Sequence, residues 1–334
     1  MRKQVTMKDI AEEMGVSIVT VSKALSGKDG VSEDLREDIV SKADEMGYLA
    51  KEERKRKAAA NPNVAILIAE RFVGDNSFYV SIYQKMIMEL SSRDLIAIVE
   101  IIRYEDEKSG KLPVSIQTQT ATQAIIIGEM KAVFLESLKK SGAGMVFFDF
   151  ENEEFDADTV VGDNLGGGYK MTRYLSKKGY KKIGYVGNIK ATANILDRFM
   201  GHLKCVLAND LIYEQSWLIN DRNNDNEDVD IVLPKNMPEA FFCNCDKTAY
   251  RLIETLNKAG YRVPEDIAVV GYDDFAPSIP AGVELTTYRV DTDEMVRQCI
   301  HIVHQRSLNP MYRRGNTLVK GSLIERKTAG KVKK

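Results

Sequence analysis

Residues 5–27 read Val5-Thr-Met-Lys-Asp-Ile-Ala-Glu-Glu-Met-Gly-Val-Ser-Ile-Val-Thr-Val-Ser-Lys-Ala-Leu-Ser-Gly27. Apolar residues recur here at helical spacing in two short segments, 6–14 and 17–25, which Gly15 separates. A third amphipathic segment runs from Ser32 to Met46 and ends at Gly47. Three short helices without a strand signal predict a helix-turn-helix, whose second helix enters a DNA major groove.

The second of these helices carries the side chains that would read DNA. Hydroxyls and a lysine suit contacts to phosphates and base edges. The set expected on its exposed face is Ile18, Val19, Thr20, Ser22 and Lys23. The alternative is a three-helix bundle that binds another protein, and the pattern alone leaves that alternative open.

The composition bounds the class of protein. The chain of 334 residues has 47 basic and 49 acidic residues, a net charge of -2, and four cysteines. This balance excludes a protein coated in basic charge, and four cysteines make a disulfide scaffold implausible. No apolar run approaches the length of a membrane span, and Met1–Asp9 lack the apolar core of a signal peptide. We therefore expect a cytoplasmic protein with no membrane partner.

A basic segment separates the first 50 residues from the rest. The run Lys51-Glu-Glu-Arg-Lys-Arg-Lys57 has five basic and two acidic residues, and Ala-Ala-Ala-Asn-Pro-Asn63 follows it. A solvated linker is the plainest interpretation, but the position beside a helix-turn-helix favours contact with DNA. We assign 1–50 to a DNA-binding headpiece and 51–63 to a basic hinge.

From Val64 onward, strand and helix patterns alternate. Strands are predicted at 64–69, 95–102, 124–127, 145–148, 183–186, 240–243 and 267–270. Helices are predicted at 78–90, 133–140, 198–208 and 247–259, with one more that starts near Asn164 and runs through Leu175. This alternation predicts an α/β fold of mainly parallel sheets with helices on both faces, arranged as two similar subdomains.

Several motifs resemble the lactose-repressor (LacI/GalR) family of bacterial transcription regulators. The stretch Val5–Gly27 looks like the start of that family, and Val31-Ser32, Arg36 and Gly47-Tyr48 continue the match. Similar segments follow in the family's order: Val161–Tyr169, Arg198-Phe-Met-Gly201, Val263–Asp274, Leu285-Thr-Thr287 and Leu323–Thr328. Together these matches cover nearly the whole chain.

The resemblance implies an architecture and a set of partners. The core would resemble type I periplasmic binding proteins, with two doubly wound parallel-sheet subdomains joined by crossovers near Gly162, Val290 and Gly321. The subdomains would be 64–162 plus 291–321 and 163–290 plus 322–330. The family implies a homodimer on a pseudo-palindromic operator of double-stranded DNA, in the bacterial cytoplasm and associated with the nucleoid. A protein corepressor remains an open alternative to a small-molecule effector.

The resemblance also assigns DNA contacts. Ile18 and Val19 occupy base-reading positions, where apolar side chains suit thymine methyl groups, although surface scatter is the plain alternative for Val19. Lys23 would reach guanine or phosphate. The hydroxyl residues Thr6, Ser17, Thr20 and Ser22 would contact phosphates.

The hinge departs from the family pattern. Its basic residues Arg54, Lys55 and Lys57 are expected to contact DNA phosphates. Lys57 stands where the family has a leucine that wedges into the minor groove. Because a lysine cannot act as an apolar wedge, the sequence predicts weaker DNA bending and a steep dependence of affinity on salt.

The effector would lie between the subdomains. By resemblance, the candidate contacts are Phe78, Tyr79, Asp149, Arg198, Asp246 and Asp273. Aromatic rings stack on a sugar or base, carboxylates accept from hydroxyls, and arginine binds hydroxyls or a carboxylate. The two aromatics could instead be plain core, and Asp246 and Asp273 could be capping residues. Cys245 replaces the asparagine usual in the family, and 104–123 depart from the family pattern.

The predicted function is sequence-specific transcription regulation, expected to be repression, controlled by a small molecule such as a sugar. The alternative is a stand-alone binding protein or a sugar-modifying enzyme with an accessory helical domain. We find no nucleotide fingerprint or catalytic triad to support an enzyme. His301 with His304 and Cys243 with Cys245 lack the further ligands of a metal site, so no metal or cofactor is expected.

Overall fold

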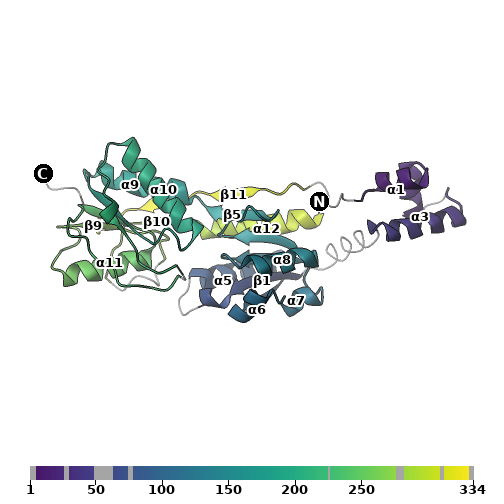
Figure 1. Ribbon diagram of the computed structural model, residues 1–334, viewed down its shortest axis with the longest axis horizontal. Coiled ribbons are helices and arrows are strands. Elements are labelled where there is room, and N and C mark those ends of the chain that lie inside the picture. Colours follow the sequence, from purple (N-terminus) through teal and green to yellow (C-terminus); the bar gives the residue numbers. More distant parts are fainter. Residues whose placement is uncertain are drawn as a thin grey trace. The chain divides into compact units, whose positions relative to one another are not determined.

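The computed structural model describes residues 5–25, 30–48, 63–73, 78–224, 226–275, 282–308 and 312–330. The chain divides into two compact units, Met1–Pro62 and Asn63–Lys334 (Figure 1). Within the described residues, we find no helix with the length and apolarity that a membrane crossing requires.

The first unit contains the predicted helix-turn-helix. Its helices are α1 (Met7–Met14), α2 (Ile18–Leu25) and α3 (Glu33–Glu45). Thr6 begins α1 through a capping box: its hydroxyl accepts from the Asp9 N–H (3.3 Å), and its own N–H donates to the Asp9 carboxylate (2.7 Å). Gly15 ends α1 in the left-handed conformation. Ile10, Val21 and Ile39 are fully buried where the helices meet.

Six parallel strands form the first sheet of the second unit. They are β1 (Asn63–Ala69), β2 (Ile96–Ile102), β3 (Gln123–Ile127), β4 (Gly144–Phe148), β5 (Asp158–Gly162) and β11 (Asn316–Val319). Their order is β11-β5-β4-β3-β1-β2. After its first residue, Asn63, the inner strand β1 is apolar and buried, which is typical of a parallel sheet covered on both faces.

The helices around this sheet are α5 (Phe78–Ser91), α6 (Tyr104–Ser109), α7 (Val114–Gln117), α8 (Ala132–Ser141) and α12 (Thr292–Leu308), with a short 3₁₀ helix η1 (Glu70–Phe72). The segment that departs from the family pattern forms α6 and α7. Glu107 on α6 is fully buried, accepts from the Lys131 N–H (2.7 Å) and pairs with Arg71. These two contacts tie α6 to η1 and to the start of α8.

A second group of strands forms two smaller sheets. Parallel strands β7 (Leu218–Ile219), β6 (Ile183–Val186), β8 (Ala240–Cys243) and β9 (Ala268–Val270) pair in that order. Strands β10 (Thr287–Arg289) and β12 (Ser322–Ile324) form an antiparallel pair. The surrounding helices are α9 (Asn164–Lys177), α10 (Ala193–Ala208) and α11 (Asp246–Lys258), with the 3₁₀ helix η2 (Gln215–Trp217). The parallel α/β fold predicted from the sequence is therefore present.

Helix α10 begins at Ala193 rather than at the predicted Arg198. The hydroxyl of Thr192 caps it by accepting from the Ile195 N–H (3.3 Å). This earlier start matters for the site, because the added first turn of α10 lines the pocket described below.

The chain crosses between the two groups of strands at three places (Figure 1). Helix α9 follows β5 and leads to β6, α12 leads from β10 back to β11, and Gly321 lies between β11 and β12. A Cβ at Gly321 would lie 2.1 Å from the Arg289 carbonyl oxygen, so this close approach requires glycine.

Candidate functional site

Helix α2 presents the predicted DNA-reading side chains on the first unit. Ile18 and Val19 leave 48% and 64% of their surface exposed, and Ser22 and Lys23 are also exposed. Large apolar side chains at the start of a helix-turn-helix recognition helix suit contact with thymine methyl groups.

Two of the predicted phosphate-contact residues, Ser17 and Thr6, also cap helices of the first unit. Ser17 caps α2 by accepting from the Thr20 N–H (3.0 Å), and the two hydroxyls lie 2.8 Å apart. Thr6 caps α1 as described. Arg36 on α3 donates to the Ala24 carbonyl at the end of α2 (3.0 Å). Arg54, Lys55 and Lys57 lie outside the described residues.

A pocket of about 200 Å³ lies in the second unit, where the carboxyl ends of strands from both sheets meet. In open α/β sheets this is the position where ligands bind. The first sheet and its helices contribute Phe72, Phe78, Tyr79, Glu129, Asp149 and Phe150. The second contributes Thr192, Ala193, Asn194, Ile195, Arg198, Arg222, Asn226, Asn244, Cys245 and Asp273.

Tyr79 and Asp149 form one wall. The Tyr79 hydroxyl donates to the Asp149 carboxylate (2.8 Å). Burial raises the pKa of Asp149, while Arg198 and the hydrogen bond from Tyr79 oppose the rise. Burial and the nearby Asp149 carboxylate raise the pKa of Tyr79 well above its usual value, so the hydroxyl remains a donor.

Arg198 on α10 is the central cation of the opposite wall and is almost completely buried. It donates to the Asn164 side-chain oxygen (2.8 Å) and to the Asn244 carbonyl (2.7 Å), and its guanidinium lies 4.0 Å from the centre of the Tyr272 ring. Burial alone would lower its pKa, but the nearby Asp273, Tyr272 and Asp149 raise it by more. The net shift is upward, so the guanidinium stays charged.

Asp273, just after β9, faces this arginine. A carboxylate oxygen of Asp273 lies 3.6 Å from the Arg198 Nη2. Burial raises the pKa of Asp273 to about 7; Arg198 and Arg222 oppose the rise, and Asp149 adds to it. The carboxyl group can therefore accept or donate a hydrogen bond near neutral pH.

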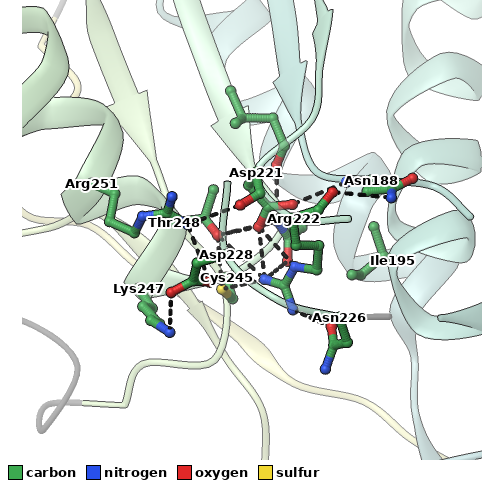
Figure 2. Close-up of polar contacts among 12 residues, drawn as sticks. Asn188, Ile195, Asp221, Arg222, Asn226, Asp228, Cys245, Lys247, Thr248 and Arg251 are labelled. Atoms are coloured by element: carbon green, nitrogen blue, oxygen red, sulfur yellow. Dashed lines mark hydrogen bonds and ion pairs between the residues drawn. The ribbon is translucent and has the colours of Figure 1, made fainter. Parts of the chain in front are cut away.

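A second arginine reaches the pocket from the loop after β7 (Figure 2). Arg222 pairs with Asp221 at 2.7 Å and donates to the Asn226 side chain (2.9 Å). Asp221 is fully buried and also accepts from Thr248 (2.5 Å) and Asn244 (2.8 Å). Burial would raise the pKa of Asp221, but these hydrogen bonds and the charge of Arg222 lower it to about 2. Arg222 is therefore held in place before any ligand arrives.

Two segments of the chain match known protein families. Residues 6–50 match the family described as "Bacterial regulatory proteins, lacI family", and residues 172–329 match "Periplasmic binding protein-like domain". The protein belongs to the LacI family. Like that family, it is a DNA-binding transcription regulator that joins a helix-turn-helix to a ligand-binding core.

Relatives of the LacI family align along almost the whole chain. The HTH-type transcriptional repressor PurR of Photobacterium profundum is 25% identical over 341 residues, covering 97% of this chain and 98% of PurR. The structure titled transcriptional regulator CelR–cellobiose complex gives a TM-score of 0.66 at 21% identity, covering 97% and 100%. The lac repressor dimer bound to operator and the anti-inducer ONPF gives 0.65 at 18%, covering 98% and 100%.

The structure brings together most of the effector residues inferred from the LacI-family resemblance. Phe78, Tyr79, Asp149, Arg198 and Asp273 all line the pocket. Arg222, Asn194, Asn226 and Asn244 also line it and were missed. No motif marks these four, because their position depends on loops and helix starts that sequence patterns do not define.

The structure does not place Asp246, a predicted effector contact, in the lining of this pocket. Asp246 is fully buried outside the pocket lining. Its carboxylate accepts from the Thr287 hydroxyl (2.5 Å) and from the Phe275 N–H (2.9 Å). It therefore holds the loop after β9 against β10, as the capping alternative anticipated. Its neighbour Cys245 does line the pocket, with its sulfur 3.2 Å from the Thr248 hydroxyl.

Proposed function

We propose that this LacI-family chain is a homodimeric repressor that binds a pseudo-palindromic operator and changes its operator affinity when a sugar or related metabolite enters the pocket. The observation that carries the proposal is the polar pocket at the carboxyl ends of both sets of strands, in a chain that also bears an exposed recognition helix. We place the protein in the bacterial cytoplasm, on the nucleoid.

The chemistry of the pocket supports a small polyhydroxylated effector. Arg198 and Arg222 supply donors, Asp149 and Asp273 supply acceptors, and side-chain amides line the space between them. The rings of Phe72 and Tyr79, with centroids 5.0 Å apart, provide an apolar face for a sugar ring. The related CelR structure contains cellobiose. A protein corepressor is the alternative to a small-molecule effector. A screen in which no small molecule changes the operator affinity would favour it.

Selection of random DNA duplexes by the purified full-length protein, near physiological salt, tests the regulatory function. Enrichment of a two-fold symmetric site is the expected result, and a sugar panel is then screened for changes in affinity for that site. Binding that is sensitive to salt but independent of sequence would contradict operator recognition. No binding at low salt would exclude DNA regulation altogether.

We propose that Val19 reads a thymine methyl group, with Ile18 beside it and Lys23 at guanine or phosphate. Replacing the contacted thymine by deoxyuridine removes only the methyl group, so the affinity of the wild type falls. Val19→Ala shows a smaller loss for the same replacement. An equal deoxyuridine effect in the variant would exclude this contact. Thr6, Ser17, Thr20 and Ser22, and the hinge residues Arg54, Lys55 and Lys57, are proposed phosphate contacts whose replacement weakens all sequences alike.

We propose that the homodimer forms through β2 and α5. Strand β2 is a sheet edge with Ile96 and Ile101 about half exposed, and Met88 on α5 is 72% exposed. Exposed apolar edge strands pair or are covered in native assemblies. Sedimentation equilibrium of Ile96→Lys is expected to show a weakened dimer. Leu207→Lys on α10, an apolar position that is more exposed than Ile96, is the control; equal association of both variants would locate the interface elsewhere.

A further inference from the structure

A continuous hydrogen-bond chain crosses the pocket. The Asn194 side-chain amide donates to the Asp149 carbonyl oxygen (2.9 Å). The Asn164 amide donates to the Asn194 side-chain oxygen (3.1 Å), and Arg198 Nε donates to the Asn164 side-chain oxygen (2.8 Å). Arg198 then donates through Nη1 to the Asn244 carbonyl (2.7 Å). Each asparagine uses its oxygen as acceptor and its amide as donor, which an aspartate cannot do when ionised.

This chain connects three parts of the core. Asp149 directly follows β4 of the six-stranded sheet. Asn194 lies in the first turn of α10, between β6 and β7 of the four-stranded sheet. Asn164 is the first residue of α9, the helix that leads from one sheet to the other. The hydrogen bonds therefore join both walls of the pocket to one of the three crossovers.

The backbone at Asp149 is arranged for this contact. Its φ of 65° lies in the left-handed region, which non-glycine residues seldom occupy and which is concentrated at functional positions. The Asp149 N–H donates to the Val160 carbonyl (2.9 Å), and its side chain accepts from Tyr79. Asn194 thus binds the carbonyl of Asp149, whose N–H and carboxylate are each fixed by another hydrogen bond.

We propose that Asn164 and Asn194 are positioning residues that couple Arg198 to the opening and closing of the pocket. This inference rests on the proposed function of the pocket. The Arg198 Nη2 lies 3.6 Å from the Asp273 carboxylate, which is longer than a hydrogen bond, so a ligand group in the pocket can draw on the guanidinium. Movement of Nε changes the Asn164 contact, and Asn164 in turn holds the amide of Asn194 toward Asp149. A ligand at Arg198 thereby alters the hydrogen bond by which Asn194 bridges the two walls of the pocket.

Cys245 provides a native reporter of pocket opening. It lines the pocket, whereas Cys243 and Cys299 are completely buried in the core. The rate of alkylation by iodoacetamide at Cys245, read by mass spectrometry, follows access to the pocket. Alkylation at Cys243 and Cys299 follows unfolding and serves as an internal control.

The test uses two variants of the full chain at one position. Asn194→Asp keeps the acceptor for Asn164 but removes the donor to Asp149, and Asn194→Ala removes both. Both variants lose the hydrogen bond to the Asp149 carbonyl, and this loss is expected to raise the alkylation rate of Cys245 about 2- to 10-fold in each. The rates at Cys243 and Cys299 stay unchanged. Asn209→Ala, at the other end of α10 and bonded to the Cys205 carbonyl rather than across the pocket, leaves the Cys245 rate unchanged.

Two results would overturn the inference. An unchanged Cys245 rate in both Asn194 variants would show that the bridge does not hold the pocket. Equal acceleration at Cys243, Cys245 and Cys299 would show that Asn194 only stabilises the fold. Neither readout requires DNA, so failure to select an operator would overturn the proposed function while leaving this result standing. Once an operator is selected, both variants are expected to shift its ligand-free affinity in the same direction.

Discussion

At the scale of single residues, the pocket combines buried charge with an uncommon backbone conformation. Asp149 and Asp273 have φ values of 65° and 103°, and both line the pocket. Such conformations cost about 1–3 kcal/mol for a non-glycine residue and persist where surrounding contacts fix them. The Asp273 N–H donates to the Tyr288 carbonyl (2.8 Å), which is one such contact. The two backbone conformations therefore lower the stability of the fold, and they hold the two carboxylates at the pocket.

Asp273 makes stability depend on pH in a defined direction. Its pKa is raised to about 7 by burial, so the folded protein holds this proton over a pH range in which the unfolded chain has released it. Its contribution to stability is present below the unfolded pKa near 4 and is lost as the pH rises toward 7. Relative to Asp273→Asn, the wild type is expected to lose ~2–4 kcal/mol of unfolding free energy between pH 4 and pH 8. Urea unfolding of both proteins across this range measures the difference, and parallel curves would contradict the assignment.

At the scale of elements, α9 and α10 pack side by side at a distance that only glycine permits (Figure 1). A Cβ at Gly168 would lie 2.1 Å from the Arg198 carbonyl oxygen, and one at Gly201 would lie 2.1 Å from the Leu165 carbonyl oxygen. Both obstacles are backbone atoms, which cannot move aside as a side-chain end can. The close packing places Asn164 within hydrogen-bond distance of Arg198 and Asn194.

Gly201→Ala reverses the usual effect of this substitution in a helix. Alanine normally favours a helix over glycine by about 1 kcal/mol. Here the added methyl group must push α9 and α10 apart, and we expect a loss of ~1–3 kcal/mol or more in unfolding free energy. Gly315→Ala, outside the helices and just before β11, is the control for a methyl group added in open space, because a Cβ there meets nothing within 4 Å. Urea unfolding compares the two, and equal stability of both variants would refute the packing argument.

At the scale of the whole molecule, the sequence predicted architecture better than local contacts. Strands 183–186 and 240–243 have the predicted bounds, because short apolar runs between turn signals leave few alternatives. Two-residue β7 and the short helices α6 and α7 give no periodic signal of that kind.

The pocket was predictable only in part. Asp246 and Asp273 both follow buried strands and look alike in sequence. The structure separates them by which groups each carboxylate meets: Thr287 and the Phe275 N–H for Asp246, and Arg198 for Asp273. The contributions of Arg222 and Asn194 depend on packing between segments distant in sequence, so no local pattern could have indicated them.

We propose that the basic hinge controls how the protein bends its operator; Lys57 in that hinge lies outside the described residues. Its charge and its place in the family pattern predict that affinity depends steeply on salt while DNA bends little. Lys57→Leu restores an apolar wedge, so the operator bend is expected to increase, and the salt slope, d log K/d log [salt], becomes shallower by about 0.9. Lys55→Leu removes the same charge elsewhere in the hinge and is expected to change the slope without the bend. Fluorescence energy transfer between the operator ends measures the bend, and titrations at several salt concentrations measure the slope. A wild-type bend as large as that of Lys57→Leu would mean that phosphate neutralisation alone kinks this operator.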